Sequence, residues 1–248
     1  MKINFTQVLQ DSWNFFRNQQ RILLQFVSIL FMVQVASALL SPPLIPQDAV
    51  VTNGLPDLSK VNAVGFLSGY LITQFFTTFV ATWGLMTIHK ISLQNYRTLG
   101  ESFSSTLRRF IGVLVLEIIS VIPILLGIGE VGAAVATNTS PSIISLFAII
   151  FGIWFFIRLN LSSLHYLTTQ DGVGQSLQKI WLQGKNQKAA LVVYTLIVYV
   201  FVPVLILQLS ALATNMLFVL ILGIIASLLS IFMLVVTYRF YSLFMKES

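Results

Sequence analysis

The chain has 248 residues, of which 56% are hydrophobic and only 9% charged, and its mean hydropathy is +0.89. Soluble domains are about 45–50% apolar and about 25% charged, so most of this chain is expected to be solvated by lipid. Cysteine is absent, which excludes disulfides, thiolate metal sites, iron–sulfur clusters and cysteine nucleophiles. The net charge of +6 does not indicate a nucleic-acid partner, because the basic residues flank apolar segments instead of forming one stripe.

Long apolar stretches follow one another along the whole chain. A transmembrane helix needs about 20 apolar residues to cross a hydrocarbon core of about 30 Å. Six stretches are long enough: residues 22–41, 62–88, 110–129, 141–157, 189–210 and 216–238. The fourth is the shortest, although Pro141 suits a helix N-terminus and apolar residues beyond 157 could lengthen it. The sequence therefore predicts an all-α, polytopic helical membrane bundle in a single integral membrane domain, residues 1–248.

The positions of lysine and arginine predict the orientation of this bundle. Thirteen of the fourteen precede the first stretch, lie between the second and third or the fourth and fifth, or follow the sixth. Only Lys60 falls on the other side. Short basic loops stay in the cytoplasm, so both termini are expected there, in a multi-pass protein of the cell inner membrane.

The first apolar stretch also carries Ala36-Ser37-Ala38, which resembles a signal-peptidase site. The stretch is over 20 residues long and follows a long, patterned segment. These features favour a retained signal anchor, with cleavage after Ala38 as the alternative.

Two amphipathic segments precede apolar stretches. Residues 3–16 place Phe5, Val8, Leu9 and Phe16 on one helical face, and residues 173–184 repeat the pattern with Val173, Leu177, Ile180 and Trp181. Both are predicted to be helices lying in the membrane interface, with tryptophan at headgroup depth. The side chains expected to contact anionic lipid headgroups are Trp13, Arg17, Arg21, Trp181, Lys185 and Lys188.

The same segments resemble each other in sequence. The pattern Leu9-Gln10-x-x-Trp13-x-x-x-Arg17-Asn18-Gln19 matches Leu177-Gln178-x-x-Trp181-x-x-x-Lys185-Asn186-Gln187 at an offset of 168 residues. A weaker third copy runs over residues 101–109. An even number of spans per unit preserves orientation on duplication, so three parallel units are predicted, each a surface helix followed by a membrane hairpin. Chance similarity is the alternative.

Glu117 is the one ionisable residue well inside a predicted span. An intramembrane carboxylate costs about 2.5–3.5 kcal/mol, so Glu117 should face the bundle or water and is a functional candidate. The alternative is a packing role, in which it bonds to Gln74, Thr77 or Gln208. Pro123 and Pro203 are predicted to kink their helices at similar depth, a feature found both at transporter binding sites and in ordinary packing.

Other candidates carry weaker signals. Gly65 and Gly69 form a GxxxG motif, which favours close helix packing within the chain over a homodimer seam. His89 and His165 fall at the ends of spans, where interfacial anchoring is expected and a metal site is not. Arg158 ends the fourth span. No motif of a hydrolase, nucleotide-binding protein or metalloprotease is present, so no cofactor and no enzymatic activity is expected.

The block Asn14-Phe15-Phe16-Arg17-Asn18-Gln19, with Asp11 before it, resembles the N-terminal signature of the YciC-like family of uncharacterised gram-negative inner-membrane proteins. Gln170-Asp171 with Ser176 and Trp181, and the closing Arg239-Phe240-Tyr241, are similar to later segments of that family. The sequence departs from it at Gly129-Glu130-Val131-Gly132, where a Pro-Gly is expected. The resemblance implies a six-span inner-membrane protein and no catalytic residues.

These observations favour a non-enzymatic accessory or scaffold in envelope or lipid homeostasis, with anionic lipid headgroups and an unidentified membrane protein as partners. The alternative is a small transporter or channel that uses Glu117 and the two proline kinks. A lipid-modifying enzyme is a third hypothesis, without a supporting motif.

Overall fold

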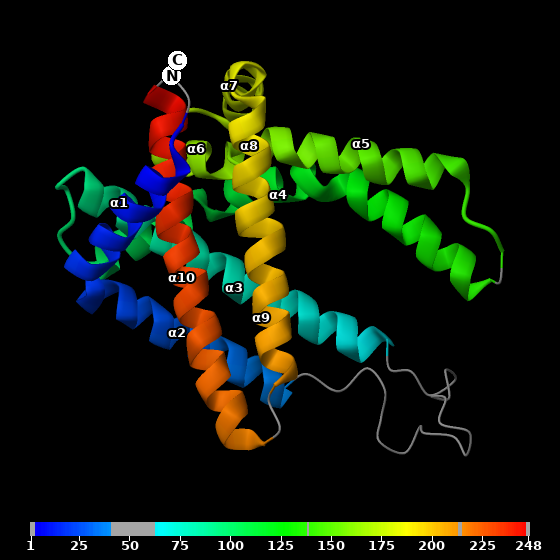
Figure 1. The fold of residues 1–248 in the computed structure, drawn as a ribbon, viewed down its shortest axis with the longest axis horizontal. Helices are drawn as coiled ribbons and strands as arrows, with labels where there is room; N and C mark the ends of the chain where they lie inside the picture. The colour runs from blue at the N-terminus through cyan, green and yellow to red at the C-terminus, as the bar shows by residue number, and fades with distance from the viewer. Residues whose placement is uncertain (1–2, 41–62, 138, 213–214, 247–248) are drawn as a thin grey trace.

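The computed structural model describes residues 3–40, 63–137, 139–212 and 215–246, and these ranges contain helices and no strand (Figure 1). The α-helices are α1 Phe5–Asn18, α2 Gln20–Leu40, α3 Ala63–Ser92, α4 Leu99–Ala136, α5 Ile143–Leu159, α6 Ser162–Thr168, α7 Val173–Asn186, α8 Lys188–Thr195, α9 Val202–Ala211 and α10 Met216–Lys246. A π-helical segment, η3 Leu196–Phe201, joins α8 to α9. The all-α class is confirmed.

Six helical stretches of the described chain are long and apolar enough to cross a membrane, as predicted. Several of these helices extend beyond one predicted bound, and α4, one helix of 38 residues, extends beyond both. The separate surface helix predicted over residues 101–109 is therefore wrong. Neither glycine nor proline stands between Glu101 and Gly112, so nothing ends the helix there, and the Thr98 hydroxyl caps it by accepting from the Glu101 N–H at 3.2 Å.

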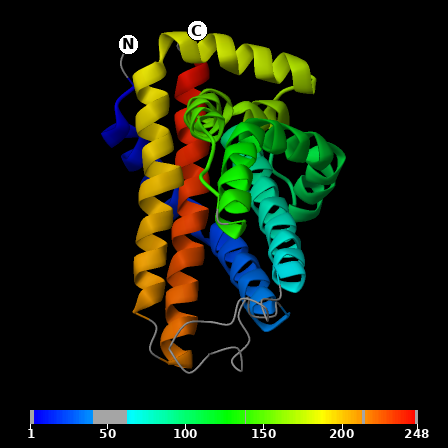
Figure 2. The same cartoon turned by 90° about the vertical axis from the view of Figure 1, so that its right-hand side faces the viewer.

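The long helices pair as three hairpins, α2 with α3, α4 with α5, and α8–η3–α9 with α10 (Figures 1 and 2). They approach one another where α1, α6 and α7 lie, and α1 packs there against the last turns of α10, with the Phe5 and Phe240 rings stacked 5.6 Å apart (Figure 1). The main hydrophobic core occupies this part of the molecule. At its centre the Tyr194 and Phe240 rings stack with centroids 4.4 Å apart and planes 4° from parallel.

The internal repeat reappears in the helix bounds. α1 and α7 have 14 residues each, and both their first and last residues differ by 168 (5 and 173, 18 and 186). The next helices, α2 and α8, begin at Gln20 and Lys188, which is the same offset. Leu23 and Leu191, also 168 apart, are both fully buried. The first and third predicted units thus share one arrangement, a short amphipathic helix followed at once by an apolar one.

α1 and α7 pack against the other helices, and the residues that they bury differ in part from the predicted apolar faces. The buried residues of α7 are Ser176, Ile180 and Gly184, which match the buried Val8, Ser12 and Phe16 of α1. Each face thus includes a serine whose hydroxyl bonds back to its own helix, Ser12 to the Val8 carbonyl at 2.7 Å and Ser176 to the Gly172 carbonyl at 2.9 Å. Leu9 and Trp13, predicted on or beside the apolar face, are 39% and 57% exposed.

Small residues allow α4 and α5 to touch through their backbones. A methyl group built on Gly152 would lie 2.6 Å from the Ile124 nitrogen, and one built on Gly127 would lie 2.8 Å from the Ser145 carbonyl oxygen. The predicted GxxxG motif is less central. Gly69 lines a space between α2 and α3 near Ser37, and Gly65 lies one turn earlier in α3. The segment Ala36-Ser37-Ala38 lies within the continuous helix α2.

The two prolines sit in different local structures. Pro123 lies inside α4, which changes direction along its length without ending (Figure 1). Pro203 stands in the first turn of α9, directly after η3. The Val202 N–H donates to the carbonyl of Ile197, five residues back, so the backbone widens just before the residue that has no N–H. Only Pro203 follows a π-helical segment, and the expectation that both prolines kink their helices at similar depth stays a prediction.

Candidate functional site

A polar pocket of about 480 Å3 lies among the last turn of α3, the first turns of α4, and α6. Its wall carries three permanent cations, Lys90, Arg108 and Arg109. No carboxylate is among the described residues that line it. We call it the cationic pocket.

The three cations differ in how far the protein already neutralises them. The Lys90 ammonium lies 2.9 Å from Glu101 Oε1 and donates to Ser105 Oγ at 2.8 Å. Glu101 itself occupies the first turn of α4, where a carboxylate favours the positive end of the helix dipole. Arg108 is exposed and makes no hydrogen bond or ion pair with any described residue. The guanidinium of Arg108 is therefore the group most available to a ligand.

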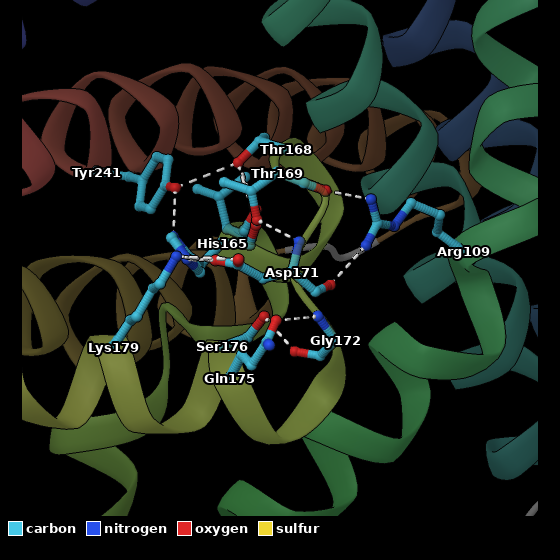
Figure 3. Close-up of polar contacts among 11 residues, drawn as sticks. Arg109, His165, Thr168, Thr169, Asp171, Gly172, Gln175, Ser176, Lys179 and Tyr241 are labelled. Carbon is cyan, nitrogen blue, oxygen red and sulfur yellow. Dashed lines mark hydrogen bonds and ion pairs between the residues drawn. The ribbon is translucent and has the colours of Figure 1, made fainter.

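Arg109 fixes the loop between α6 and α7. It donates to the backbone carbonyl of Thr169 and, at 2.9 Å, to that of Asp171 (Figure 3). Its guanidinium also lies 4.2 Å from the centroid of the Tyr166 ring, in a cation–π contact. One turn along α4, a methyl group built on Gly112 would come within 2.4 Å of the same ring. Arginine and glycine together let Tyr166 lie flat on α4 and close one side of the pocket.

A polar network behind the pocket joins α6, α7 and α10 (Figure 3). His165 is 3% exposed, with Nε2 2.7 Å from Asp171 Oδ2 and Nδ1 2.8 Å from the Tyr241 hydroxyl. The Lys179 ammonium lies 2.9 Å from Asp171 Oδ1 and 2.7 Å from Oδ2. A neutral ring that donates from Nε2 to the carboxylate accepts at Nδ1 from the tyrosine, so every ring nitrogen is used.

This network favours the ionised form of the Asp171 carboxyl. Hydrogen bonds from Lys179 and from His165 keep the pKa of the Asp171 carboxyl below its ordinary value. Tyr241 is 7% exposed, and among the described residues no serine or threonine hydroxyl bonds to the His165 imidazole. The arrangement positions the α6–α7 loop around the pocket, whose three cations suit the binding of anions.

Glu117, Pro123 and Pro203 lie outside this site. Glu117 is partly buried in α4. Of the partners predicted for it, Gln74 instead donates to the Tyr70 hydroxyl at 3.0 Å in its own helix.

The structure separates the residues predicted to contact headgroups into two sets. Arg17, Arg21, Lys185 and Lys188 are exposed, as is Trp13. Trp181 packs within the protein: its ring lies 4.8 Å from the Arg158 guanidinium and meets Trp154 edge-on at 5.2 Å. Arg158 is 5% exposed and donates to the Trp181 carbonyl. Trp181 thus covers a buried cation instead of projecting from the molecule.

Sequence reasoning missed most of the pocket. His165 and His89, expected as anchors, each bond to a tyrosine of α10, and His89 Nδ1 lies 3.1 Å from the Tyr238 hydroxyl. Arg109 and Lys179 were considered only as basic residues that indicate the orientation in the membrane. The available signal was the pair Gln170-Asp171, a polar dipeptide followed by Gly172 between two helical patterns.

The fold and the pocket together define an all-α protein with six membrane-length apolar helices and a cationic pocket among α3, α4 and α6. Over 247 residues the chain is 58% identical to an uncharacterised protein of Haemophilus influenzae, and the match covers 100% of both chains. The chain therefore belongs to the same family as that protein. No protein-family profile matches it, and no solved structure does.

Proposed function

We propose that this protein is a non-enzymatic, multi-pass component of the inner membrane, related to the YciC-like proteins, that acts as an accessory or scaffold in envelope or lipid homeostasis by binding anionic lipid headgroups. Large apolar side chains on the outer faces of the long helices support the membrane setting. Examples are Ile111 at 68%, Ile144 at 77% and Leu207 at 67% exposure. Water would not tolerate so much contiguous apolar surface, whereas lipid does.

The cationic pocket is the observation that carries the headgroup proposal. Lys90 lies at the end of α3 and Arg108 in the third turn of α4, so both cations stand where these apolar helices leave the membrane. By the distribution of basic residues this is the cytoplasmic side, where anionic lipids attract each nearby lysine or arginine by about 1 kcal/mol. The planar guanidinium of Arg108 presents paired donors that suit two phosphate oxygens.

Lipid titration of the purified full-length protein tests this function. Phosphatidylglycerol should bind in detergent, as followed by native mass spectrometry, and Arg108→Glu should weaken it about tenfold, since about 1.4 kcal/mol of phosphate contact is lost. Arg97→Glu is the matched control, because Arg97 is exposed nearby and does not line the pocket. Equal affinities for both variants and the wild type would exclude headgroup binding at this pocket.

A second candidate function is a small transporter or channel. It is favoured by one observation, a partly buried carboxylate, Glu117, in a chain that also carries a π-helical segment directly before Pro203. Single π-helical turns are frequent at functional sites. In reconstituted vesicles, a proton or cation flux that Glu117→Gln removes would establish this function, and a flux equal to that of empty vesicles would exclude it.

A further inference from the structure

A second polar pocket, of about 600 Å3, lies between α1, the end of α3 and α10. The polar side chains that line it include Asp11, Asn14, Asn18, Ser92, Gln94 and Arg239. None of these lines the cationic pocket. We call it the α1 pocket.

The α1 pocket has polar groups without partners. Arg239 lies with its guanidinium 4.8 Å from the centroid of the Phe15 ring, yet it makes no hydrogen bond or ion pair with any described residue. Its Nε is buried and unpaired, and so is the Oγ of Ser92. Buried polar atoms normally find a partner, because desolvation without one is unfavourable. A ligand with anionic oxygens in the pocket would accept from the guanidinium of Arg239, which lines it.

The backbone at Gln94 points to the same pocket. Gln94 has a φ of 55°, the only positive φ of a non-glycine residue in the described chain. Glycine would adopt this conformation at lower cost, so Gln94 carries a backbone strain that glycine would not. The turn divides its side chains between two sites: Leu93 and Asn95 line the cationic pocket, while Ser92 and Gln94 line the α1 pocket.

The charges of the two pockets differ in kind. The cationic pocket has three permanent cations and no lining carboxylate, whereas the α1 pocket has one guanidinium, Arg239, and one carboxylate, Asp11. Neither of these two is ion-paired to a described residue. A net-neutral wall with separated charges, lined by amides, favours a ligand that carries both signs.

We propose that the α1 pocket binds a zwitterion, in which Arg239 holds a phosphate or carboxylate and Asp11 holds an ammonium. The amides of Asn14, Asn18 and Gln94 orient the ligand between them. The same chemistry is offered by the headgroup of phosphatidylethanolamine and by small free zwitterions such as phosphoethanolamine. The proposal does not depend on lipid binding at the cationic pocket.

Two titrations of the purified full-length protein test it. Phosphatidylethanolamine is followed by native mass spectrometry in detergent, and phosphoethanolamine by calorimetry. At least one should bind, and Arg239→Gln and Gln94→Gly should each weaken it about tenfold. Gln94→Gly should also leave the Tm unchanged or higher, because glycine relieves the positive φ. That outcome separates lost binding from lost folding.

The controls show whether the ligand is a lipid or a free compound, and whether it binds in the α1 pocket. Binding of the lipid alone identifies a membrane headgroup, and binding of phosphoethanolamine identifies the free compound; both support the pocket. Arg97→Gln, a charge-matched change at an exposed position that lines neither pocket, should bind like wild type. The proposal is overturned if neither ligand binds, if Gln94→Gly and Arg239→Gln bind normally, or if phosphatidylglycerol binds this pocket equally well.

Discussion

Asp171 joins several elements beside the cationic pocket. Its backbone carbonyl accepts from Arg109 of α4, and its carboxylate meets His165 of α6 and Lys179 of α7. His165 extends the connection to Tyr241 of α10. One residue in a short loop thus couples four helices, so its charge state should be visible in the stability of the folded protein.

We expect Asp171→Asn to lower the Tm at neutral pH. The pKa of Asp171 is depressed in the folded protein, so its stabilisation is complete above the ordinary aspartate pKa and is lost as the pH falls through the folded value. The difference in Tm between wild type and Asp171→Asn should therefore be constant from about pH 7 to 5 and shrink below about pH 4. Thermal unfolding in detergent across this range measures it.

Lys179→Met provides the companion measurement. It removes the largest cause of the depressed pKa and leaves His165 in place, so its loss of stability on acidification should begin at a higher pH than in the wild type. A wild-type Tm that matches Asp171→Asn at pH 7, or a difference that persists at about pH 3, would show that the carboxylate does not stabilise the fold.

At the scale of elements, α4 and α5 form the most closely packed hairpin. Gly152 meets the backbone at Pro123 and Ile124, and Gly127 meets the carbonyl of Ser145. Neither contact can be relieved by rotating a side chain, because the opposing atoms belong to the backbone. Close approach of this kind replaces the hydrophobic driving force that helices lack in lipid.

Gly127→Ala and Gly129→Ala form a matched pair within α4. The added methyl of the first would lie 2.6 Å from Ile149 Cγ1 and 2.8 Å from the Ser145 carbonyl oxygen, whereas the second meets nothing within 4 Å. We expect Gly127→Ala to destabilise the protein by about 1–3 kcal/mol, as overpacking does. Gly129→Ala should be neutral or stabilising by up to about 1 kcal/mol, because alanine favours helix. Unfolding in mixed micelles measures both, and equal stabilities would contradict the contact.

At the scale of the whole molecule, the three helical hairpins and the offset of 168 residues both fit a chain built from repeated units. α1 and α7 each precede an apolar helix at the same distance, and their buried positions correspond. A unit with an even number of membrane crossings returns to its starting side, so duplicated units keep the same orientation. The packing of α1, the first helix, against the end of α10, the last, fits that requirement.

The absence of cysteine allows a clean test of topology. Asn95→Cys and Ser140→Cys place single thiols at exposed positions, in the α3–α4 turn and before α5. If both termini are cytoplasmic, a membrane-impermeant maleimide should label Ser140→Cys in intact cells from which the outer membrane barrier has been removed. Asn95→Cys should react only after lysis. The reverse labelling would invert the orientation.

Composition and pattern alone determined the all-α class, the number of membrane-length helices and the 168-residue repeat. These features are local, because each apolar helix must satisfy its own backbone in lipid and each surface helix shows its own period. The continuity of α4 was also readable from the residues before Gly112, and the surface-helix prediction there overlooked it.

Only the tertiary structure determined which residues come together to form the two pockets. Arg109 meets Asp171 across 62 positions of sequence and His89 meets Tyr238 across 149, and no periodicity encodes such pairs. The buried faces of α1 and α7 were misjudged for the same reason, since a serine bonded to its own helix can be buried while Trp13 stays outside. Lipid solvation fixes where the helices run, and the pairing of distant polar side chains fixes where ligands can bind.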